Sequence, residues 1–388
     1  MIQNNLFDLL LNSDGPVCMV IKARLKPVGD QDRFQPAGFP EIGHVIYDAP
    51  RQNGLKEKVC IVDSAASMAN HLETVCLADP NDIKLHKDLE GLPYVVCVTD
   101  RNYSVRNGRI ELDQNDSHDK PVTSTFTEGH RIASDYFLDG LLFGTLNWDS
   151  EKNEWTGEFF RDCLRREFGI TEVKRDKTYF IHPEDWWNIY RKIFKYDPNS
   201  LVHGVMFAKE KIKIQRFLIA THEAFGASRV GSSGVKFDRL GKTVSGQPIF
   251  AVDEETAKEI RATFILDLAF LRSMGRDEKG LNDAQKKLLL GLALWKIKQL
   301  TEKPFRFRTN CFLERSGDLE IKLEGGAGDQ KAPFENALFD FDVKSLIREC
   351  SFGDNPVTHV YYPANKLFKV GSEGEAKKGA ESEESEEE

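Results

Sequence analysis

The stretch RVGSSGVK at residues 229–236 combines residue types that bind phosphate groups. Its glycines can adopt positive φ and let backbone N–H groups approach a ligand closely. Its serines supply hydroxyl donors, and a cation stands at each end, which together suit a nucleic-acid backbone. The residues concerned are Arg229, Gly231, Ser232, Ser233, Gly234 and Lys236. Plain turns often share this composition, and the glycine spacing differs from that of a P-loop, so the rest of the chain must decide.

A second group of cations lies on an alternating segment near the N-terminus. Residues 17–25 place apolar side chains at every second position, which predicts a half-buried strand. Lys22 and Arg24 fall on the opposite face from these apolar residues. A sheet with one core face and one cationic face is a common RNA platform. An ordinary solvated face is an equally good interpretation of the same pattern.

Histidines with polar neighbours mark two further segments. A helix capped by Asp63 or Ser64 is predicted to run to Leu77, with Asn70 and His71 off its apolar stripe. In the stretch TFTEGHRIASDYFLDG four chemically active side chains crowd together: Glu128, His130, Arg131 and Asp135. Such a group raises a metal or acid–base hypothesis, while a hydrogen-bonded structural histidine is the alternative.

The remaining pattern alternates strands and helices, which indicates an α/β or α+β protein. Helices are predicted over 4–11, 159–168, 183–196 and 254–274, and from the cap residue Asn282 to about Leu300. Strands are predicted over 59–62, 94–99, 201–207 and 359–362, with a hairpin joining 305–314 to 319–324. Residues 212–224 alternate basic and apolar residues and then become helical in spacing. Residues 101–119 form a polar excursion with a turn at Asn107–Gly108.

Composition bounds the class of protein without fixing a partner. The 388 residues carry a formal charge of −9, of which residues 372–388 contribute −6 through eight Glu and two Lys. The near-neutral remainder neither supports nor excludes nucleic acid. Seven scattered cysteines without a CxxC spacing predict buried thiols in a reducing cytoplasm. No signal peptide and no apolar run of the ~18 residues that a membrane span needs are evident, so a cytoplasmic protein is expected.

Three stretches, taken together, resemble a known family. They are RFQPAGFPEIG (33–43) followed by VDSAASMANHLE (62–73), then FTEGHRIASDY (126–136), and finally DPNSLVHGVMF (197–207) with SRVGSSGVKFD (228–238). In this order and spacing they look like the type I-G (formerly I-U) CRISPR-associated protein. That protein belongs to the Cas-seven group of RAMP backbone subunits of the Cascade-type effector complex.

The resemblance implies an α+β fold: a modified RRM-like (ferredoxin-like) palm with large helical and loop insertions. One domain would span 1–371, with an insertion over about 101–200 and a disordered acidic tail at 372–388. Several copies would polymerise along one crRNA and present it for pairing with target DNA, beside other effector subunits. A hairpin protruding from 30–50 or from 101–121 would kink the RNA between copies. No catalysis, metal, cofactor or membrane partner is implied.

Under this resemblance the candidate RNA-binding residues lie within the matched stretches or on the cationic strand, and all but one, a glycine, have polar or cationic side chains. They are Lys22, Arg24, Arg33, Ser67, Asn70, His71, His130, Arg131, Arg229, Ser232, Ser233, Gly234 and Lys236. The usual RRM aromatic signature is missing, so base stacking on the sheet is not implied. One alternative is a metal-dependent RNA-cleaving RAMP subunit using Asp30, Asp32 or Asp135. Another is a small-molecule enzyme whose Gly/Ser loop binds a phosphorylated ligand.

Overall fold

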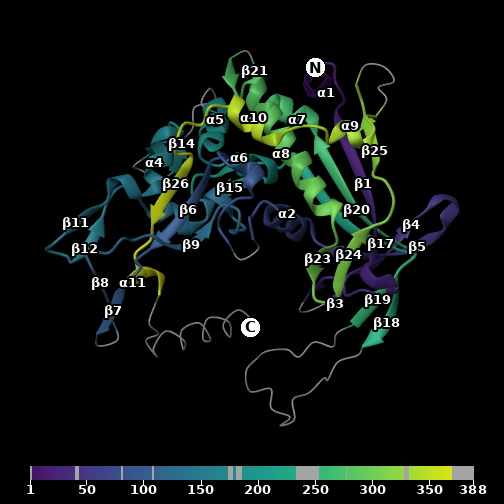
Figure 1. Ribbon diagram of the computed structural model, residues 1–388, viewed down its shortest axis with the longest axis horizontal. Coiled ribbons are helices and arrows are strands. Elements are labelled where there is room, and N and C mark those ends of the chain that lie inside the picture. The colour runs from purple at the N-terminus through teal and green to yellow at the C-terminus, as the bar shows by residue number, and fades with distance from the viewer. Residues whose placement is uncertain are drawn as a thin grey trace, which may run out of the picture.

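The chain forms a crescent with one β-sheet towards each end and helix α8 (Asp283–Glu302) near the middle of its convex side (Figure 1). The structure is a computed structural model. It describes residues 2–39, 43–79, 82–106, 109–173, 178–180, 186–232, 253–276, 278–326 and 332–368. Helix α2 (Ala65–Thr74) lies at the middle of the concave side.

The larger sheet contains a ferredoxin-like core. Four antiparallel strands run in the order β25 (Glu320–Glu324), β1 (Cys18–Pro27), β20 (Glu259–Asp267) and β17 (Leu218–Phe225). Along the chain α2 lies between β1 and β17, and α8 lies between β20 and β25. This is the βαββαβ arrangement of ferredoxin-like and RRM domains. The predicted α+β class with an RRM-like palm is therefore confirmed.

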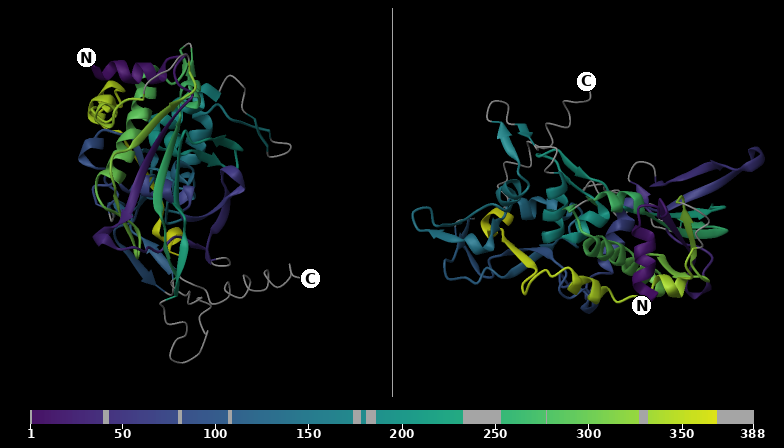
Figure 2. Two further views of the ribbon diagram at one scale, coloured as in Figure 1. Left: turned by 90° about the vertical axis from the view of Figure 1, so that its right-hand side faces the viewer. Right: turned by 90° about the horizontal axis from the view of Figure 1, so that it is seen from above.

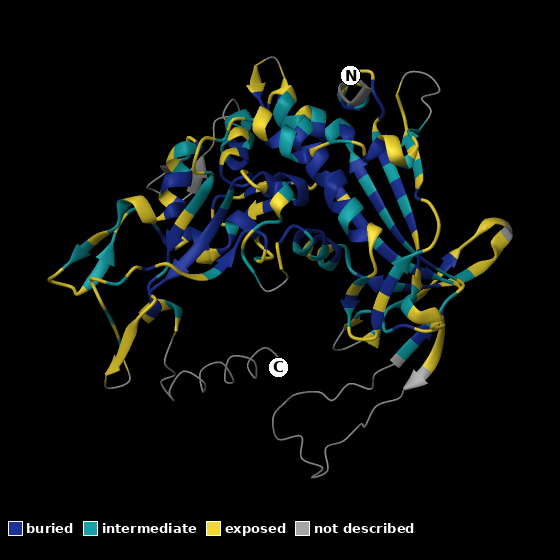
Figure 3. Ribbon diagram, viewed as in Figure 1, coloured by how far each residue is buried: buried dark blue, intermediate teal, exposed yellow. Residues whose placement is uncertain are grey.

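Alternation of side chains gives this sheet one buried and one open face. On β1, Met19, Ile21 and Ala23 are fully buried beneath the helices, whereas Arg24 is exposed. Strand β20 alternates in the same way, and its stripes are visible in Figure 3. The register places Lys22 opposite Thr263 and Arg24 opposite Arg261. Since directly paired residues share a face, these polar side chains all project from the open face.

Additional strands extend the core at both edges. Strands β5 (Lys56–Asp63) and β4 (Ile46–Pro50) continue the sheet beyond β17, and their hairpin projects from the molecule (Figures 1 and 2). Strands β24 (Cys311–Arg315) and β23 (Phe305–Arg308) are added beside the end of β1. The predicted hairpin between 305–314 and 319–324 is wrong, because β24 and β25 both pair with β1 rather than with each other.

The smaller sheet is built mainly from the segment between α2 and β17. Its order is β10 (Leu141–Leu142), β26 (Val357–Tyr361), β6 (Tyr94–Thr99) and β9 (Lys120–Ser124). The C-terminal strand β26 joins β6 in parallel. Strands β7 (Tyr103–Arg106) and β8 (Arg109–Leu112) pair within the predicted polar excursion, while the turn predicted at Asn107–Gly108 lies outside the described residues. The β7–β8 pair projects from the opposite end of the crescent to β4–β5 (Figure 1).

Helices fill the space between and over the sheets. The longer ones are α1 (Ile2–Leu11), α4 (Phe160–Glu167), α5 (Trp186–Tyr196), α6 (Pro198–His203), α7 (Leu268–Ser273) and α10 (Val343–Glu349). Helix α8 is buried over much of its circumference, as its leucine-rich sequence predicts. Asn282 caps α8: its side chain accepts from the Gln285 N–H, and the Gln285 side chain accepts from the Asn282 N–H.

Shorter elements complete the described chain. The helical ones are η1 (Val28–Asp30), η2 (Gln52–Gly54), η3 (Lys87–Leu89), η4 (Arg131–Ala133), α3 (Asp135–Leu138), η5 (Phe143–Thr145), α9 (Glu335–Leu338) and α11 (Ala364–Leu367). The strands are β2 (Gly38–Phe39), β3 (Gly43–His44), β11 (Asn147–Asp149), β12 (Glu154–Thr156), β13 (Thr171–Val173), β14 (Thr178–Phe180), β15 (Val205–Phe207), β16 (Ile212–Ile214), β18 (Ser228–Ser232), β19 (Asp253–Thr256), β21 (Gly275–Arg276) and β22 (Lys279–Gly280).

Three predicted elements differ in the structure. The helix expected over 254–274 is instead β19, β20 and α7, and the strand expected over 201–207 is the end of α6 followed by β15. The helical spacing within 212–224 belongs to strands β16 and β17. All seven cysteine thiols are free and five are buried, in line with the prediction of buried thiols. Among the described helices, none has the length and apolarity required to cross a bilayer.

Candidate nucleic-acid interface

The cations predicted on β1 project from the open face of the large sheet, where carboxylates partly balance them. Lys22 Nζ lies 3.5 Å from Glu320 Oε1. Arg24 Nε lies 3.8 Å from Glu259 Oε1, and the Arg24 side chain stays 69% exposed. Exposed pairs of this kind exchange partners at little cost in free energy. Both cations can therefore turn to a phosphate, although the face has mixed charge.

The predicted residues of α2 do not join Lys22 and Arg24. His71 packs edge-on against Phe305 and Phe307, on the helix-covered side of the sheet. Its Nε2 lies 2.8 Å from Asp63 Oδ2 and 3.4 Å from Ser67 Oγ. Ser67 and His71 are thus engaged beneath the sheet. Asn70 is exposed on the outer surface of α2.

Asp63 connects this cluster to an arginine at the sheet edge. Its Oδ1 lies 2.8 Å from Arg308 Nη2. Burial alone would raise the pKa of the Asp63 carboxyl, but the hydrogen bond from His71 and the charge of Arg308 outweigh burial and hold the pKa below its ordinary value. The carboxylate therefore stays ionised and holds Arg308 in place.

Two other predicted arginines form ion pairs with consecutive glutamates of β19, on opposite sides of that strand. Arg33 Nε lies 3.4 Å from Glu254 Oε2, and Arg229 Nε lies 3.2 Å from Glu255 Oε1. Strands β18 and β19 continue the β17–β20 hairpin outward, so Arg229 and Gly231 lie towards the far end of that hairpin. Ser232 ends β18, while Ser233, Gly234 and Lys236 lie outside the described residues.

The last predicted pair, His130 and Arg131, lines a groove of about 600 Å³. Residues 203–206 and 213–216 form the rest of its wall, with Ala65 at the start of α2 and Ile219 on the open face of the sheet. His130, Lys213 and Arg216 are exposed at this groove. Among the described residues that line it, none is acidic, unlike the mixed face of β1. Met206 is 57% exposed and adds an apolar surface.

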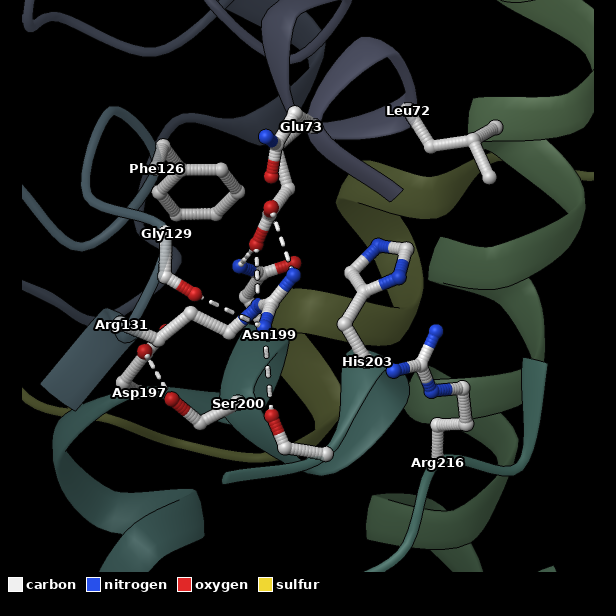
Figure 4. A network of polar contacts seen from close by, with 12 residues as sticks. Leu72, Glu73, Phe126, Gly129, Arg131, Asp197, Asn199, Ser200, His203 and Arg216 are labelled. Atoms are coloured by element: carbon white, nitrogen blue, oxygen red, sulfur yellow. Dashed lines mark hydrogen bonds and ion pairs between the residues drawn. The ribbon is translucent and has the colours of Figure 1, made fainter. Parts of the chain in front are cut away.

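The Arg131 side chain differs from its neighbours because it is buried in the groove wall. Its Nε donates to Glu73 Oε1 at 2.6 Å and its Nη2 donates to Glu73 Oε2 at 2.9 Å. Its Nη1 donates to the carbonyl oxygens of Gly129 and Gly204, both at 3.3 Å (Figure 4). The guanidinium thus ties α2 to two backbone segments of the groove. Because Glu73 balances its charge, the role of Arg131 in the groove is structural: it holds the wall in place.

A second buried layer supports this wall. Asn199 Nδ2 donates to Glu73 Oε1 at 2.6 Å, and Lys296 Nζ on α8 donates to Asn199 Oδ1. Lys296 Nζ also lies 2.9 Å from His203 Nε2, a residue that lines the groove. Burial, followed by the Lys296 charge, lowers the pKa of His203 well below its ordinary value, so the ring is neutral and accepts from Lys296. This network holds in place the wall of the groove that Lys213 and Arg216 also line.

Comparison of the sequence with protein-family profiles identifies the family of the chain. The profile of the CRISPR-associated protein GSU0053 family matches residues 19–229, more than half of the chain. The chain belongs to this CRISPR-associated family. Among curated proteins, none matches it. The matched range runs from β1 to β18 and contains the whole acid-free groove. Membership of the GSU0053 family associates the chain with CRISPR defence.

Sequence reasoning did not single out Lys213 and Arg216, the two exposed cations that line the groove. Their signal is present in the segment KIKIQR, residues 211–216, where cations alternate with apolar residues. Ile212 and Ile214 are buried and Lys213 and Gln215 are exposed, as period two requires. The pattern predicts an exposed cation at Lys213. It contains no information on the distant loop at His130 that completes the groove.

The acidic residues considered for metal-dependent cleavage do not gather. Asp30 and Asp32 are exposed in one loop, and Asp135 Oδ1 accepts from Arg161 Nη2 at 3.0 Å. Within the described chain, one cluster of three potential metal ligands occurs, formed by Asp100, Asp116 and His118. It contains none of the three proposed acids. Its carboxylates already accept hydrogen bonds from Tyr361, Ala364, Arg101, Asn102 and His118.

Proposed function

We propose that this chain is a crRNA-binding backbone subunit of a type I-G CRISPR interference complex. Several copies lie side by side along one guide RNA and present its bases to target DNA, together with other effector subunits. The observation that carries this proposal is the acid-free groove at His130, Lys213 and Arg216, which reaches the open face of an RRM-like sheet at Ile219. Family membership supplies the CRISPR context.

The composition of the groove suits an RNA backbone of any sequence. Lys213 and Arg216 offer charge to phosphate oxygens, and phosphate contacts carry no direct sequence information. Met206 and Ile219 offer apolar surface to sugar or base. Sequence would then be read by pairing between guide and target rather than by the protein, as in RNA-guided complexes generally.

Self-association is supported by the two projecting hairpins. The β4–β5 and β7–β8 hairpins leave opposite ends of the crescent (Figure 1). Leu55 in the β4–β5 connection is 67% exposed and Val105 on β7 is 58% exposed. A head-to-tail filament needs different contact surfaces on opposite ends of each copy. These hairpins provide an exposed apolar residue at each end.

The test is the nucleic acid that co-purifies with the protein. The chain is expressed with its partner subunits, with and without a CRISPR array, and bound material is measured by absorbance at 260 nm and sequenced. We expect discrete RNA of a length set by the array. A double variant, Lys213→Ala with Arg216→Ala, should lose most of this RNA, whereas Lys366→Ala, which removes an exposed cation elsewhere, should retain it. Protein free of RNA under both conditions would overturn the proposal.

We further propose that the subunit holds RNA without cutting it. Bound RNA should keep its length on incubation with Mg²⁺ and with EDTA alike. Shortening that requires Mg²⁺ and disappears in Asp30→Asn, Asp32→Asn or Asp135→Asn would replace this proposal with the RNA-cleaving alternative. The same samples answer both questions.

A further inference from the structure

A second cationic pocket lies at the Pro27 end of β1. Most of the residues in its wall lie outside residues 19–229, the range that the family profile matches. The pocket has a volume of about 340 Å³, at the lower end of small-ligand sites. Residues 27, 28, 31 and 33 form one side, and residues 306, 308–310 and 312 form the other. Among the described residues that line it, none is acidic. No candidate from the sequence other than Arg33 belongs to it.

An exposed aromatic ring and an arginine are cross-strand neighbours in the β23–β24 hairpin that lines this pocket. Phe312 on β24 pairs directly with Arg306 on β23, so the two side chains share one face of the ladder. Glu314, two residues after Phe312, pairs with Lys26. Since Lys26 follows Lys22 and Arg24 at period two, Phe312 and Arg306 project from the open face of the large sheet. Phe312 is 47% exposed, in contrast to its buried neighbours Cys311 and Leu313.

The three arginines of the pocket differ in how their charge is balanced. Arg308 is held by Asp63 and donates to the Val62 carbonyl oxygen at 2.6 Å, so it forms a rigid wall. Arg33 pairs with Glu254 but its side chain stays 55% exposed. Arg306 donates to Thr309 Oγ1 at 3.3 Å, and among the described residues no carboxylate pairs with it. Its charge is available to an anion.

We propose that this pocket holds one unstacked nucleotide of the bound RNA strand. The base stacks on the Phe312 ring, and Arg306 with Arg33 holds the adjoining phosphate. An exposed aromatic ring beside an unbalanced arginine is the combination by which proteins hold single strands. The amide side chains of Gln31 and Asn310 line the same pocket and can reach base edges. The inference rests on the proposed RNA-binding function and adds a base-stacking site at the far end of the same sheet face.

The test measures binding of a fluorescent single-stranded RNA, too short for two copies, to the full chain over a series of salt concentrations. Phe312→Ala should weaken binding by roughly 5-fold to 150-fold, the usual value of one stacked base, with an unchanged salt dependence. Phe312→Tyr should restore binding because it keeps the aromatic face. Arg306→Ala should instead reduce the slope of log affinity against log salt by about 0.7, the value for one phosphate contact.

Matched controls separate this site from the general RNA-binding function. Phe334→Ala removes a side chain that is 87% exposed at another place and should leave binding unchanged. An RNA carrying a photoreactive uracil should crosslink to residues 305–315. If Phe312→Ala bound RNA as tightly as wild type and no crosslink formed in this segment, the proposed nucleotide site would be wrong while the proposed function would stay intact. If Phe312→Ala changed only the oligomeric state in light scattering, the ring would belong to a contact between copies, and the inference would be wrong.

Discussion

The Arg131 guanidinium grips both carboxylate oxygens of Glu73, with Nε–Oε1 at 2.6 Å and Nη2–Oε2 at 2.9 Å. Both side chains are buried, so each charge is balanced by the other rather than by water. The pair joins α2 to the loop that carries His130. An arginine that the sequence suggests as an RNA contact therefore has a clear structural role in the groove wall.

Removing one partner of this pair should destabilise the protein strongly. Arg131→Ala leaves the buried Glu73 carboxylate without its directly hydrogen-bonded counter-charge, which typically costs about 3–5 kcal/mol in the free energy of unfolding. Urea denaturation followed by circular dichroism measures the loss. The double variant Arg131→Met with Glu73→Gln should recover most of it, because no unpaired charge remains. A loss below about 1 kcal/mol in the single variant would show that the pair is not stabilising in solution.

The exposed cations of the groove should behave in the opposite way. Lys213→Ala and Arg216→Ala remove no buried contact, so the free energy of unfolding should change by no more than about 0.5 kcal/mol. Each should weaken RNA binding equally for unrelated sequences and reduce the salt slope by about 0.7. Fluorescence anisotropy with two RNAs of different sequence measures both effects. A loss of affinity confined to one RNA would mean that these residues read bases.

The elements that the sequence predicts well are those whose local signals agree. Helix α8 has an Asn282 cap, an apolar run and Pro304 just after its end, and the structure follows all three. Strand β1 shows an alternation that no helix would produce. In both cases the side-chain period and the end signals specify the same element.

Strand β20 shows why the rest could not be predicted. Ile260, Phe264 and Leu268 fit helical spacing, yet Ile260, Ala262 and Phe264 also fit period two. Pairing with β1 on one side and β17 on the other makes this segment a strand. A single sequence does not contain information on that pairing. The groove was missed for the same reason, since His130 and Lys213 meet only through the tertiary fold.

Loss of the α8 cap should have a small, measurable cost. Asn282→Ala removes the side-chain oxygen that accepts from the Gln285 N–H and keeps the backbone N–H that donates to the Gln285 side chain, so it should lower the free energy of unfolding by about 1 kcal/mol. Asn282→Ser keeps an oxygen able to accept from the Gln285 N–H and should lose much less. Chemical denaturation of the two variants side by side provides the comparison. Equal losses would show that the cap oxygen does not stabilise α8.

Asp197 beneath the groove should make stability depend on pH. The carboxyl is fully buried, and burial raises its pKa to about 7 even though Ser200 donates to it at 2.6 Å and Lys296 and Arg131 lie near. In the unfolded chain the pKa is about 3.9. Between these values the folded state binds the proton more tightly, so this contribution to stability is complete at low pH and is lost as pH rises through 7.

Asp197→Asn removes that ionisation while keeping the shape of the side chain. The variant should gain stability relative to wild type as pH increases from 5 to 8, by about 2–3 kcal/mol, because about two of the roughly three units of pKa shift fall within this pH range. Urea midpoints of both proteins at these two pH values give the difference directly. Ser200→Ala, which removes the donor and leaves the carboxyl, should keep the wild-type direction of the pH dependence. A difference between Asp197→Asn and wild type that is the same at both pH values would mean that Asp197 does not titrate in this range.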